Sequence, residues 1–436
     1  MLRRASVLTV FLLIAACGGN DTETSVPDST PPPEPPPPGL GAMVYTGVTV
    51  WDGTGSSAQE DVNLVVRDGR VESISPDVPA GAQIVDLAGK WVVPGIINSH
   101  GHVSGRWAPD SVTDPADQVR GDLALYARYG VTTVLSQGGA PDEAFVVRAD
   151  QDDASLTHAR LYLSGDVVAG ETAELAAAVA SANIDKGVDW IKMRVDDNLG
   201  AGTKMPWEAV QAAIDIARAA GKPVTTHIFY MDDAARLLAM GTGMIAHSVR
   251  DKEVSDEFVQ AMLDSGVCYV PTLVREVSTF VYAERPAWFD DPFFQEGALQ
   301  REIDRVTSPE NMQRVANSSA AAAYKEALAQ AQANLRILIG SGVPIAFGTD
   351  SGVAGRFIGY FEHMEFDLMA EAGLTAREIL LSATSGAAGC LGIGDVGTLE
   401  PGKWADFIVL NENPLDDIRG MRSIQDVFIA GNKVAR

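Results

Sequence analysis

The 436-residue sequence predicts an α/β protein, a (β/α)8 TIM barrel with a small β-sandwich domain formed from both chain ends. Two observations predict this fold. Between residues 91 and 395, apolar β runs alternate with Ala-rich helical stretches, which is typical of βαβ units around a parallel sheet. Residues 43–90 and 396–436 contain short β runs separated by turn residues, so we expect the two ends to build one sandwich together.

The region predicted to form the barrel contains candidates for all eight strands. Eight βα units over about 300 residues fit a barrel that carries one insertion. The insertion is expected between strands seven and eight, from Arg275 to about Val315. Its many aromatic residues fit either a lid over the active site or a buried helical hairpin. The eight strands are expected to begin at Val92, Gly130, Arg160, Asp189, Pro223, Met244, Val267 and Pro344.

The N-terminus is predicted to be a targeting segment outside the fold. Residues 1–16 have the positive start and short apolar run of a signal peptide. Residues 14–17 resemble a bacterial lipobox, which implies cleavage before Cys17 and its acylation. Residues 17–42 then form an acylated, Pro-rich tether. The acylated cysteine would anchor the protein in the bacterial cell envelope, and Gly18 in place of Asp after it implies the outer membrane, facing the periplasm. The alternative is an ordinary secreted protein with a chance cysteine.

Charge and cysteine content exclude other classes. The formal net charge of -25 argues against a nucleic-acid partner but indicates little about the substrate, which we expect to be a small molecule. Three cysteines do not make a disulfide framework, so we expect Cys268 and Cys390 to be small buried hydrophobes. The oligomeric state stays open, with a homo-oligomer as one alternative.

Side chains that can bind metal recur at the predicted carboxyl ends of the barrel strands, where TIM-barrel active sites lie. A further candidate, Lys192, lies inside an apolar strand, where a charged amine is costly to bury. Desolvation lowers the pKa of such an amine, which can then add carbon dioxide to give a carbamate. The strand-end candidates are His100 and His102 on the first strand, His227 on the fifth, His247 on the sixth and Asp350 on the eighth.

This set of residues resembles the amidohydrolase superfamily, and residues 397–406 resemble one of its signatures. The chain is most similar to the prolidase-like, Xaa-Pro dipeptidase-type and imidazolonepropionase-related branch. The resemblance implies two divalent metal ions, expected to be Zn, and N6-carboxylysine at Lys192. One metal would be held by His100, His102, Lys192 and Asp350, and the other by Lys192, His227 and His247.

The resemblance implies hydrolysis of an amide or peptide bond, in a dipeptide or N-acyl amino acid, by hydroxide bridging the metals. Asp350 would act as general base and then as general acid. Tyr230 would either donate a hydrogen bond to the oxyanion or pack as a loop aromatic. His363 and Glu365 together would support the eighth-strand loop from the following helix. Three arginines could clamp a substrate carboxylate or form structural ion pairs: Arg194, Arg250 and Arg275.

Three other functions remain as alternatives. Hydrolysis of an ester, lactone, carbamate or organophosphate would use the same metal site. A mononuclear deaminase would place glutamate where Tyr230 stands and would leave Lys192 without a role. A non-catalytic surface lipoprotein would not need the six intact site residues. Residues 194–197 also depart from the branch pattern, in which small residues follow the lysine, so the family substrate does not transfer directly.

Overall fold

The computed structural model describes residues 41–436. The predicted signal peptide at 1–16, the acylation site Cys17 and nearly all of the predicted tether at 17–42 lie outside this range. Within it the protein has a TIM-barrel-type α/β fold. No helix among residues 41–436 has both the length and the apolar character needed to cross a membrane.

Seven parallel strands form two sheets that follow the chain order. The first sheet has the order β6-β7-β8, with β6 at Ile96–Gly101, β7 at Val131–Ser136 and β8 at Arg160–Leu163. The second has β9 at Ile191–Arg194, β10 at Val224–His227, β11 at Met244–Ala246 and β12 at Cys268–Val270. These strands match the second to seventh predicted barrel strands and the latter part of the first.

Backbone hydrogen bonds connect the two sheets at both sides. Val168, after β8, donates to the carbonyl of Lys192 on β9 at 2.8 Å. The predicted eighth strand is an extended stretch around 344–349 with only an isolated bridge at Ile345. On one side of this stretch Tyr269 N donates to Pro344 O at 2.9 Å, and on the other Ser99 N donates to Phe347 O at 2.8 Å.

The predicted first barrel strand divides into two strands at Gly95. Residues 91–94 form β5 (Trp91–Pro94), which pairs with strands from the chain ends, whereas β6 belongs to the barrel region. Close packing explains the break, because a Cβ atom at Gly95 would lie 2.0 Å from Thr132 Oγ1. The boundary between the end domain and the barrel region was expected at residue 91. In the structure β5 still belongs to the sheet of the chain ends, so this boundary lies after residue 94.

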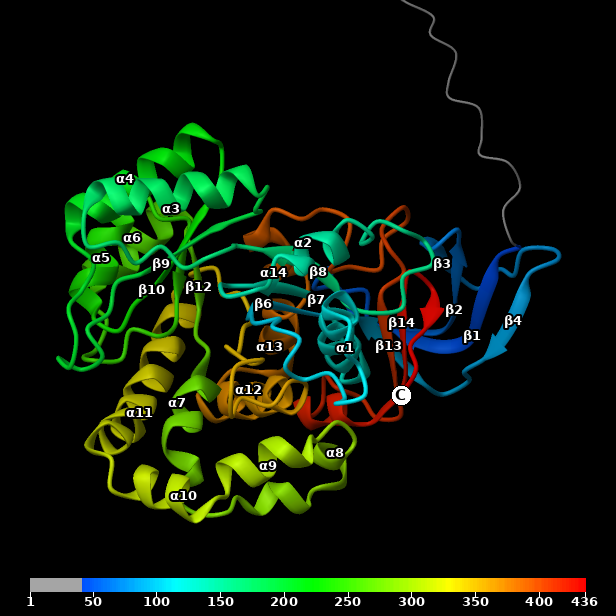
Figure 1. Ribbon diagram of the computed structural model, residues 1–436. Helices are drawn as coiled ribbons and strands as arrows, with labels where there is room; N and C mark the ends of the chain where they lie inside the picture. Colours follow the sequence, from blue (N-terminus) through cyan, green and yellow to red (C-terminus); the bar gives the residue numbers. More distant parts are fainter. Residues whose placement is uncertain (1–40) are drawn as a thin grey trace, which may run out of the picture. The chain divides into compact units, whose positions relative to one another are not determined.

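The two chain ends share one eight-stranded sheet, which confirms the prediction that they fold together. In the middle of this sheet β5 pairs with β13, so strands from the N-terminal and C-terminal parts of the chain lie side by side (Figure 1). Asp68 and Gly69 form the predicted turn between β2 and β3, both with positive φ. The remaining strands are β1 (Met43–Val50), β2 (Gln59–Arg67), β3 (Arg70–Ser75), β4 (Gln83–Asp86), β13 (Phe407–Leu410), β14 (Ile424–Ile429) and β15 (Asn432–Lys433).

Helices cover the parallel strands from outside, and Figure 1 shows α3 to α6 gathered around β9 to β12. Asp114 begins the first helix by accepting hydrogen bonds from Ala116 N and Asp117 N. The helices before the insertion are α1 (Pro115–Arg128), α2 (Glu143–Arg148), α3 (Ala173–Asp185), α4 (Trp207–Ala219), α5 (Met231–Met240) and α6 (Asp256–Ser265).

The insertion between strands seven and eight is a packed set of short helices. Phe289 and Phe294 are fully buried, and the Trp288 ring stacks on Tyr360 with centroids 5.1 Å apart. This arrangement matches the buried alternative. The helices are α7 (Leu273–Phe280), η1 (Val281–Ala283), η2 (Ala287–Asp290), α8 (Pro292–Gln295), α9 (Gln300–Val306) and α10 (Pro309–Ala316), followed by the long α11 (Ser319–Gly340).

After the eighth strand the chain forms α12 (Tyr360–Glu371), α13 (Ala376–Ser382) and α14 (Ser385–Leu391). A disulfide joins Cys268 on β12 to Cys390 on α14. The expectation of two unlinked cysteines was wrong. The two residues are 122 positions apart, and their spacing in the sequence does not reveal that the fold brings their Cα atoms to 5.8 Å.

The disulfide gives a stability prediction. Replacing both Cys268 and Cys390 by Ala should lower the free energy of unfolding by about 2–4 kcal/mol, because a long loop is no longer closed in the unfolded chain. Urea unfolding with and without reductant measures this difference. Reductant should lower the stability of the wild type and leave the double variant unchanged. A wild type that does not respond to reductant would contradict the bond.

Candidate metal centre

The structure brings all six predicted metal ligands into one cavity of about 210 Å³ at the carboxyl ends of the strands. Lys192 lies within β9, and His227 is the last residue of β10. His247 follows β11 directly, and Asp350 follows the extended eighth stretch. His100 and His102 come from the end of β6 and the other four side chains from four further segments, so the fold itself makes this cluster.

His100, His102 and Asp350 form its tightest group, in which one ligand atom from each lies within 4.8 Å of the others. Asp350 Oδ1 lies 2.7 Å from His102 Nε2 and 3.6 Å from His100 Nε2. The other nitrogen of His102, Nδ1, contacts the carbonyl of Gly138 at 2.9 Å. This carbonyl fixes the ring so that Nε2 faces the carboxylate.

Lys192 is buried at the centre of the cluster. Its Nζ donates to Gln137 Oε1 at 2.8 Å and lies 3.2 Å from His100 Nε2. Burial lowers the pKa of Lys192 to about 7. Gln137 also accepts a hydrogen bond from Thr225 Oγ1 and thus holds the amine from the β7 side. The sequence analysis missed Gln137, although its place just after β7 was a usable signal.

His227 and His247 form the other side of the cluster, with ring centroids 4.2 Å apart. Burial lowers the pKa of His227 to about 3 and that of His247 well below its ordinary value. Thr272 Oγ1 lies 2.7 Å from His247 Nδ1. His227 Nε2 lies 2.9 Å from the carboxylate of Asp196, which leaves its Nδ1 as the free ring nitrogen. Both histidines are therefore neutral bases held by a partner on one nitrogen.

Arg356 neutralises Asp350 through an ion pair with Oδ2. Burial alone would raise the pKa of Asp350, but the charge of Arg356 and the hydrogen bond with His102 bring this pKa well below its ordinary range. The carboxylate is thus ionised at neutral pH. Arg356 had no signal in the sequence, since it follows the strand by several residues.

Three residues around the cavity have the left-handed backbone conformation. The φ angles are 70° at His247, 47° at Thr272 and 60° at Asp350. This conformation is unfavourable for a β-branched residue such as Thr272. Backbone strain of this kind gathers at functional sites, where surrounding contacts impose it. It places His247 and Thr272 in contact and turns Asp350 toward the histidines.

A buried carboxylate, Glu362 on α12, supports the eighth-strand loop. The prediction had given this role to His363, whose Nε2 instead contacts the carbonyl of Tyr129 at 2.9 Å. Glu365 accepts hydrogen bonds from the first backbone amides of α7, so it supports the loop after strand seven. Glu362 accepts hydrogen bonds from Asn98 Nδ2, Thr349 Oγ1, Ser351 Oγ and Gly359 N.

The predicted substrate arginines have different surroundings. Arg194 and Arg275 line the cavity, and the buried Nε of Arg275 has no hydrogen-bond partner among the described residues. Arg250 is not among the described residues that line the cavity, because it is fully buried against Glu276 and the carbonyl of Ile228. The prediction for Arg250 is therefore corrected to a structural ion pair.

Tyr230 also differs from its predicted placement. Its hydroxyl donates to Asp197 Oδ1 at 2.9 Å, and the Lys204 ammonium lies over its ring. Tyr230 does not line the cavity within the described range. In this arrangement the side chain, which lies between β10 and α5, packs against the loop that follows β9, and this is the second of the two predicted alternatives.

The donor set fits a divalent metal. Four imidazoles, one carboxylate and one amine of lowered pKa converge in a small buried space, and His100 Nδ1 has no hydrogen-bond partner among the described residues. Neutral imidazole with carboxylate oxygen is the ligand set that Zn²⁺ prefers. A neutral amine near pH 7 is also the form of Lys192 that can become a carbamate.

Fold and site together define a TIM-barrel-type protein with a buried site suited to metal at the strand ends. Residues 91–434 match the Amidohydrolase family, and the chain belongs to that family. The resemblance read from the sequence is confirmed, and with it the prediction of an enzyme from a hydrolase family.

Solved structures agree with the predicted branch. A provisionally named prolidase from Bifidobacterium longum is 25% identical, with a TM-score of 0.72, and the match covers 92% of this chain and 96% of that one. A Xaa-Pro dipeptidase with methionine bound in its active site has a TM-score of 0.70. It is 21% identical, and the match covers 91% of this chain and 100% of the other, so this likeness shows the fold alone.

Curated relatives are more distant or only partly covered. An uncharacterized protein of Mycobacterium tuberculosis is 30% identical over 233 residues, which is 51% of this chain and 60% of the relative. The chain thus spans less than two thirds of that relative's length. A 5-methylthioadenosine/S-adenosylhomocysteine deaminase of Bacillus anthracis is 22% identical over 388 residues, 81% of this chain and 83% of the deaminase.

The contact between Asp196 and His227 gives a prediction on metal affinity. Replacing Asp196 by Ala should weaken zinc binding by about 10–100-fold, because the ring loses the carboxylate that orients it. Competition with a chelator measures this affinity. Asp197→Ala is the matched control, since its carboxylate contacts Tyr230 and no histidine. Equal affinities for the two variants would rule out the orienting role.

Proposed function

We propose that the protein is a metal-dependent amidohydrolase that cleaves an amide or peptide bond in a dipeptide or N-acyl amino acid. One observation carries the proposal: Lys192 lies 3.2 Å from His100 inside a buried cluster that also contains Asp350. An amine, four imidazoles and a carboxylate lie together in this cavity, and the fold does not require so many ionisable groups in one buried place. Burying them is costly, so their presence points to chemistry.

The cofactors in this proposal are two divalent metals, for which zinc is the best match to the donors. When bound, they would supply Lewis acidity for a carbonyl and for an attacking water. His100, His102, Lys192 and Asp350 would hold one, and Lys192, His227 and His247 the other.

The remaining chemistry belongs to the side chains of the cavity. Asp350 is ionised at neutral pH because Arg356 lowers its pKa, so Asp350 can accept a proton from water. It can return the proton to the leaving amine, as a general base and then a general acid. Arg194 and Arg275 line the same cavity and present guanidinium groups to a substrate carboxylate.

Lys192 is proposed to become N6-carboxylysine. Its pKa of about 7 makes the neutral amine available near physiological pH, and a neutral amine adds carbon dioxide. The amine nitrogen would form a bond to the carbon of carbon dioxide and lose one proton to water, so the product would be an anionic carbamate whose oxygens could serve as metal ligands. In that form the charge of Lys192 would complement divalent cations instead of opposing them.

The same cavity could also hydrolyse an ester, lactone, carbamate or organophosphate. The amide is favoured because the structure with 25% identity is provisionally named a prolidase. A deaminase resembles the chain at 22% identity, but Tyr230 stands where the mononuclear deaminases have glutamate.

We further propose that the described strands close a complete (β/α)8 barrel and that the end sheet is part of a β-sandwich. The hydrogen bonds on both sides of residues 344–349 support the barrel. The expected boundaries are 43–90 and 396–436 for the sandwich and 91–395 for the barrel, with β5 as the exception found above.

The protein is proposed to be lipid-anchored through Cys17 at the outer membrane, facing the periplasm. The disulfide between Cys268 and Cys390 supports an oxidising compartment, since such bonds persist outside the cytoplasm. The homo-oligomer stays a prediction.

A substrate screen tests the function. The zinc-loaded protein should release amine from members of dipeptide and N-acyl amino acid libraries, measured by mass spectrometry, with esters and lactones as controls. Turnover of esters alone would overturn the amide proposal, and a folded protein that binds no metal would overturn every enzymatic version.

Bicarbonate dependence tests the carbamate. Apoprotein given zinc and bicarbonate should bind about two zinc ions per chain, and fewer when carbon dioxide is excluded, because the bridging ligand cannot form. Lys192→Ala should lose this response and lose activity by about hundredfold or more. The exposed Lys186, changed to Ala, is the control. A Lys192→Ala variant that kept both metals would disprove the bridge.

A further inference from the structure

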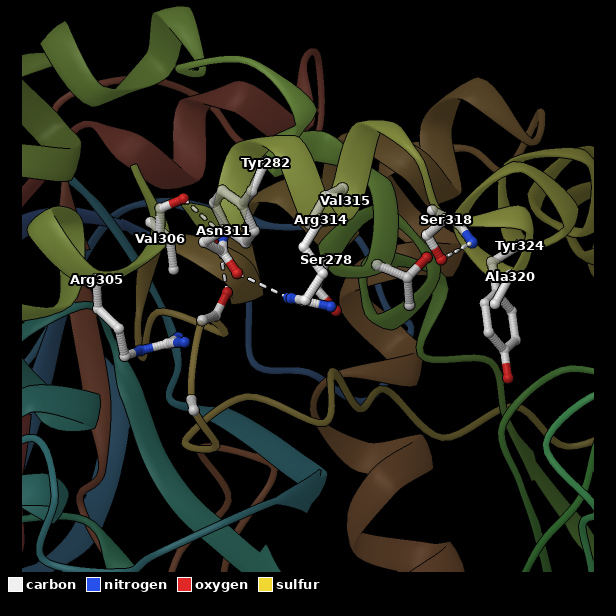
Figure 2. A pocket seen from close by; sticks show the side chains of 14 residues that line it. Ser278, Tyr282, Arg305, Val306, Asn311, Arg314, Val315, Ser318, Ala320 and Tyr324 are labelled. Carbon is white, nitrogen blue, oxygen red and sulfur yellow. Dashed lines mark hydrogen bonds between the residues drawn. The ribbon is translucent and has the colours of Figure 1, made fainter. Parts of the chain in front are cut away.

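A second cavity lies beside the candidate metal centre, enclosed mainly by the insertion and the start of α11. Its volume is about 270 Å³. The labelled side chains in Figure 2 surround it, with Arg305 and Tyr324 on opposite sides of the view and Arg314 between them. Apart from Ala354 and Gly355, after the eighth strand, its lining comes from α7 to α11. The barrel itself therefore contributes little to this space.

Two arginines connect the linings of the two cavities. Arg356 lines the metal cavity, pairs there with Asp350, and donates through Nε to Ser278 Oγ of the second cavity at 3.0 Å. Arg275 lines the metal cavity and lies over the ring of Tyr324, 4.6 Å from its centroid. Arg275 and Arg356 of the metal cavity thus contact residues that line the second cavity, so the two cavities are neighbours.

The second cavity is cationic in a strongly anionic protein. Its charged lining residues are Arg305 and Arg314, while the whole chain has a net charge of -25. Arg305 is balanced by Glu302 at 2.6 Å. Arg314 donates to the neutral amide of Asn311 at 2.7 Å and has no carboxylate in ion-pair distance within residues 41–436. The positive charge of Arg314 is therefore available to a ligand.

The N-terminus of α11 adds to the positive electrostatic potential in this cavity. Ser318, the capping residue of this long helix, and Ala321 both line the cavity. A helix N-terminus carries partial positive charge and favours anions. Hydroxyl groups of Ser278 and Tyr282 complete a polar wall that contains no carboxylate among the lining residues.

We propose that this cavity binds the acidic side chain of a substrate whose amide bond lies at the candidate metal centre, with Arg314 as the main contact. This inference rests on the proposed function and narrows its substrate class to acidic dipeptides or acidic N-acyl amino acids. Arg275 and Arg356 lie along the path between the bond and the acidic group. A planar guanidinium binds carboxylate through paired hydrogen bonds, so arginine suits this role.

Matched substrates test the proposal. Dipeptides that differ only in Glu against Gln keep the same backbone charges, so their ratio of kcat/KM reports the acidic side chain alone. The zinc-loaded wild type should prefer Glu by about tenfold, the scale of one charge-assisted contact. Arg314→Gln should abolish the preference, mainly through KM for the Glu substrate, and Arg314→Lys should keep part of it.

Arg285→Gln is the control, because Arg285 is an exposed residue of the same insertion that pairs with Asp290 and does not line either described cavity. It should keep the wild-type preference. If amides are cleaved but Glu and Gln substrates react equally, or if Arg314→Gln keeps the preference, the acidic subsite is wrong and the amidohydrolase proposal stands.

Binding of glutarate separates the two proposals when no amide is cleaved. Calorimetry on the zinc-loaded proteins should show a dissociation constant about five- to tenfold higher for Arg314→Gln than for the wild type and for Arg285→Gln. If Arg314→Gln binds glutarate more weakly in this way but no amide is cleaved, the proposed amide hydrolysis is wrong and the acidic subsite is supported. Equal constants for all three proteins would overturn the subsite.

Discussion

The buried carboxylate of Glu362 connects β6 to the extended stretch before Asp350, two segments that lie far apart in the sequence. It accepts hydrogen bonds from Asn98 on β6 and from Thr349 next to Asp350. Asn98 Oδ1 in turn accepts a hydrogen bond from the backbone amide of His100 at 2.9 Å. Burial raises the pKa of Glu362, and hydrogen bonds from its neighbours offset part of that cost. Glu362 on α12 thus sets the position of His100 relative to the carboxylate of Asp350.

Burial then decides the chemical state of the groups that this network positions. It keeps His227 and His247 neutral, so their lone pairs are available, and it moves the pKa of Lys192 close to neutrality. A lone carboxylate in the same surroundings would become protonated. Asp350 avoids this because Arg356 supplies a full positive charge beside it. The cavity therefore combines neutral imidazoles and an ionised carboxylate with an amine whose pKa lies near neutrality, whereas the same amine in water would be protonated at that pH.

The sequence was sufficient for the parts of the site that belong to regular strands. Alternating β and helical runs placed His227 and His247 at strand ends, and a lysine in an apolar run was conspicuous at Lys192. The residues that support these ligands could not be predicted from the sequence pattern. Asp196 and Arg356 lie in loops whose paths depend on what packs against them, and no periodicity describes a loop. The disulfide and the Glu362 network were missed for the same reason, because each joins residues far apart in the chain.

The division between strands and loops also separates chemistry from recognition. The strand ends hold a donor set that would serve many hydrolytic reactions, since amide and ester cleavage need the same Lewis acid and base. The insertion starts within the helix that carries Arg275, and it packs against the loop that carries Arg356. The insertion therefore contacts the lining of the metal cavity through Arg275 and Arg356. The aromatic packing of the insertion also reaches α12, where Trp288 stacks on Tyr360, two residues before Glu362. The helix that positions Asn98 and Thr349 through Glu362 is therefore the same helix that anchors the insertion.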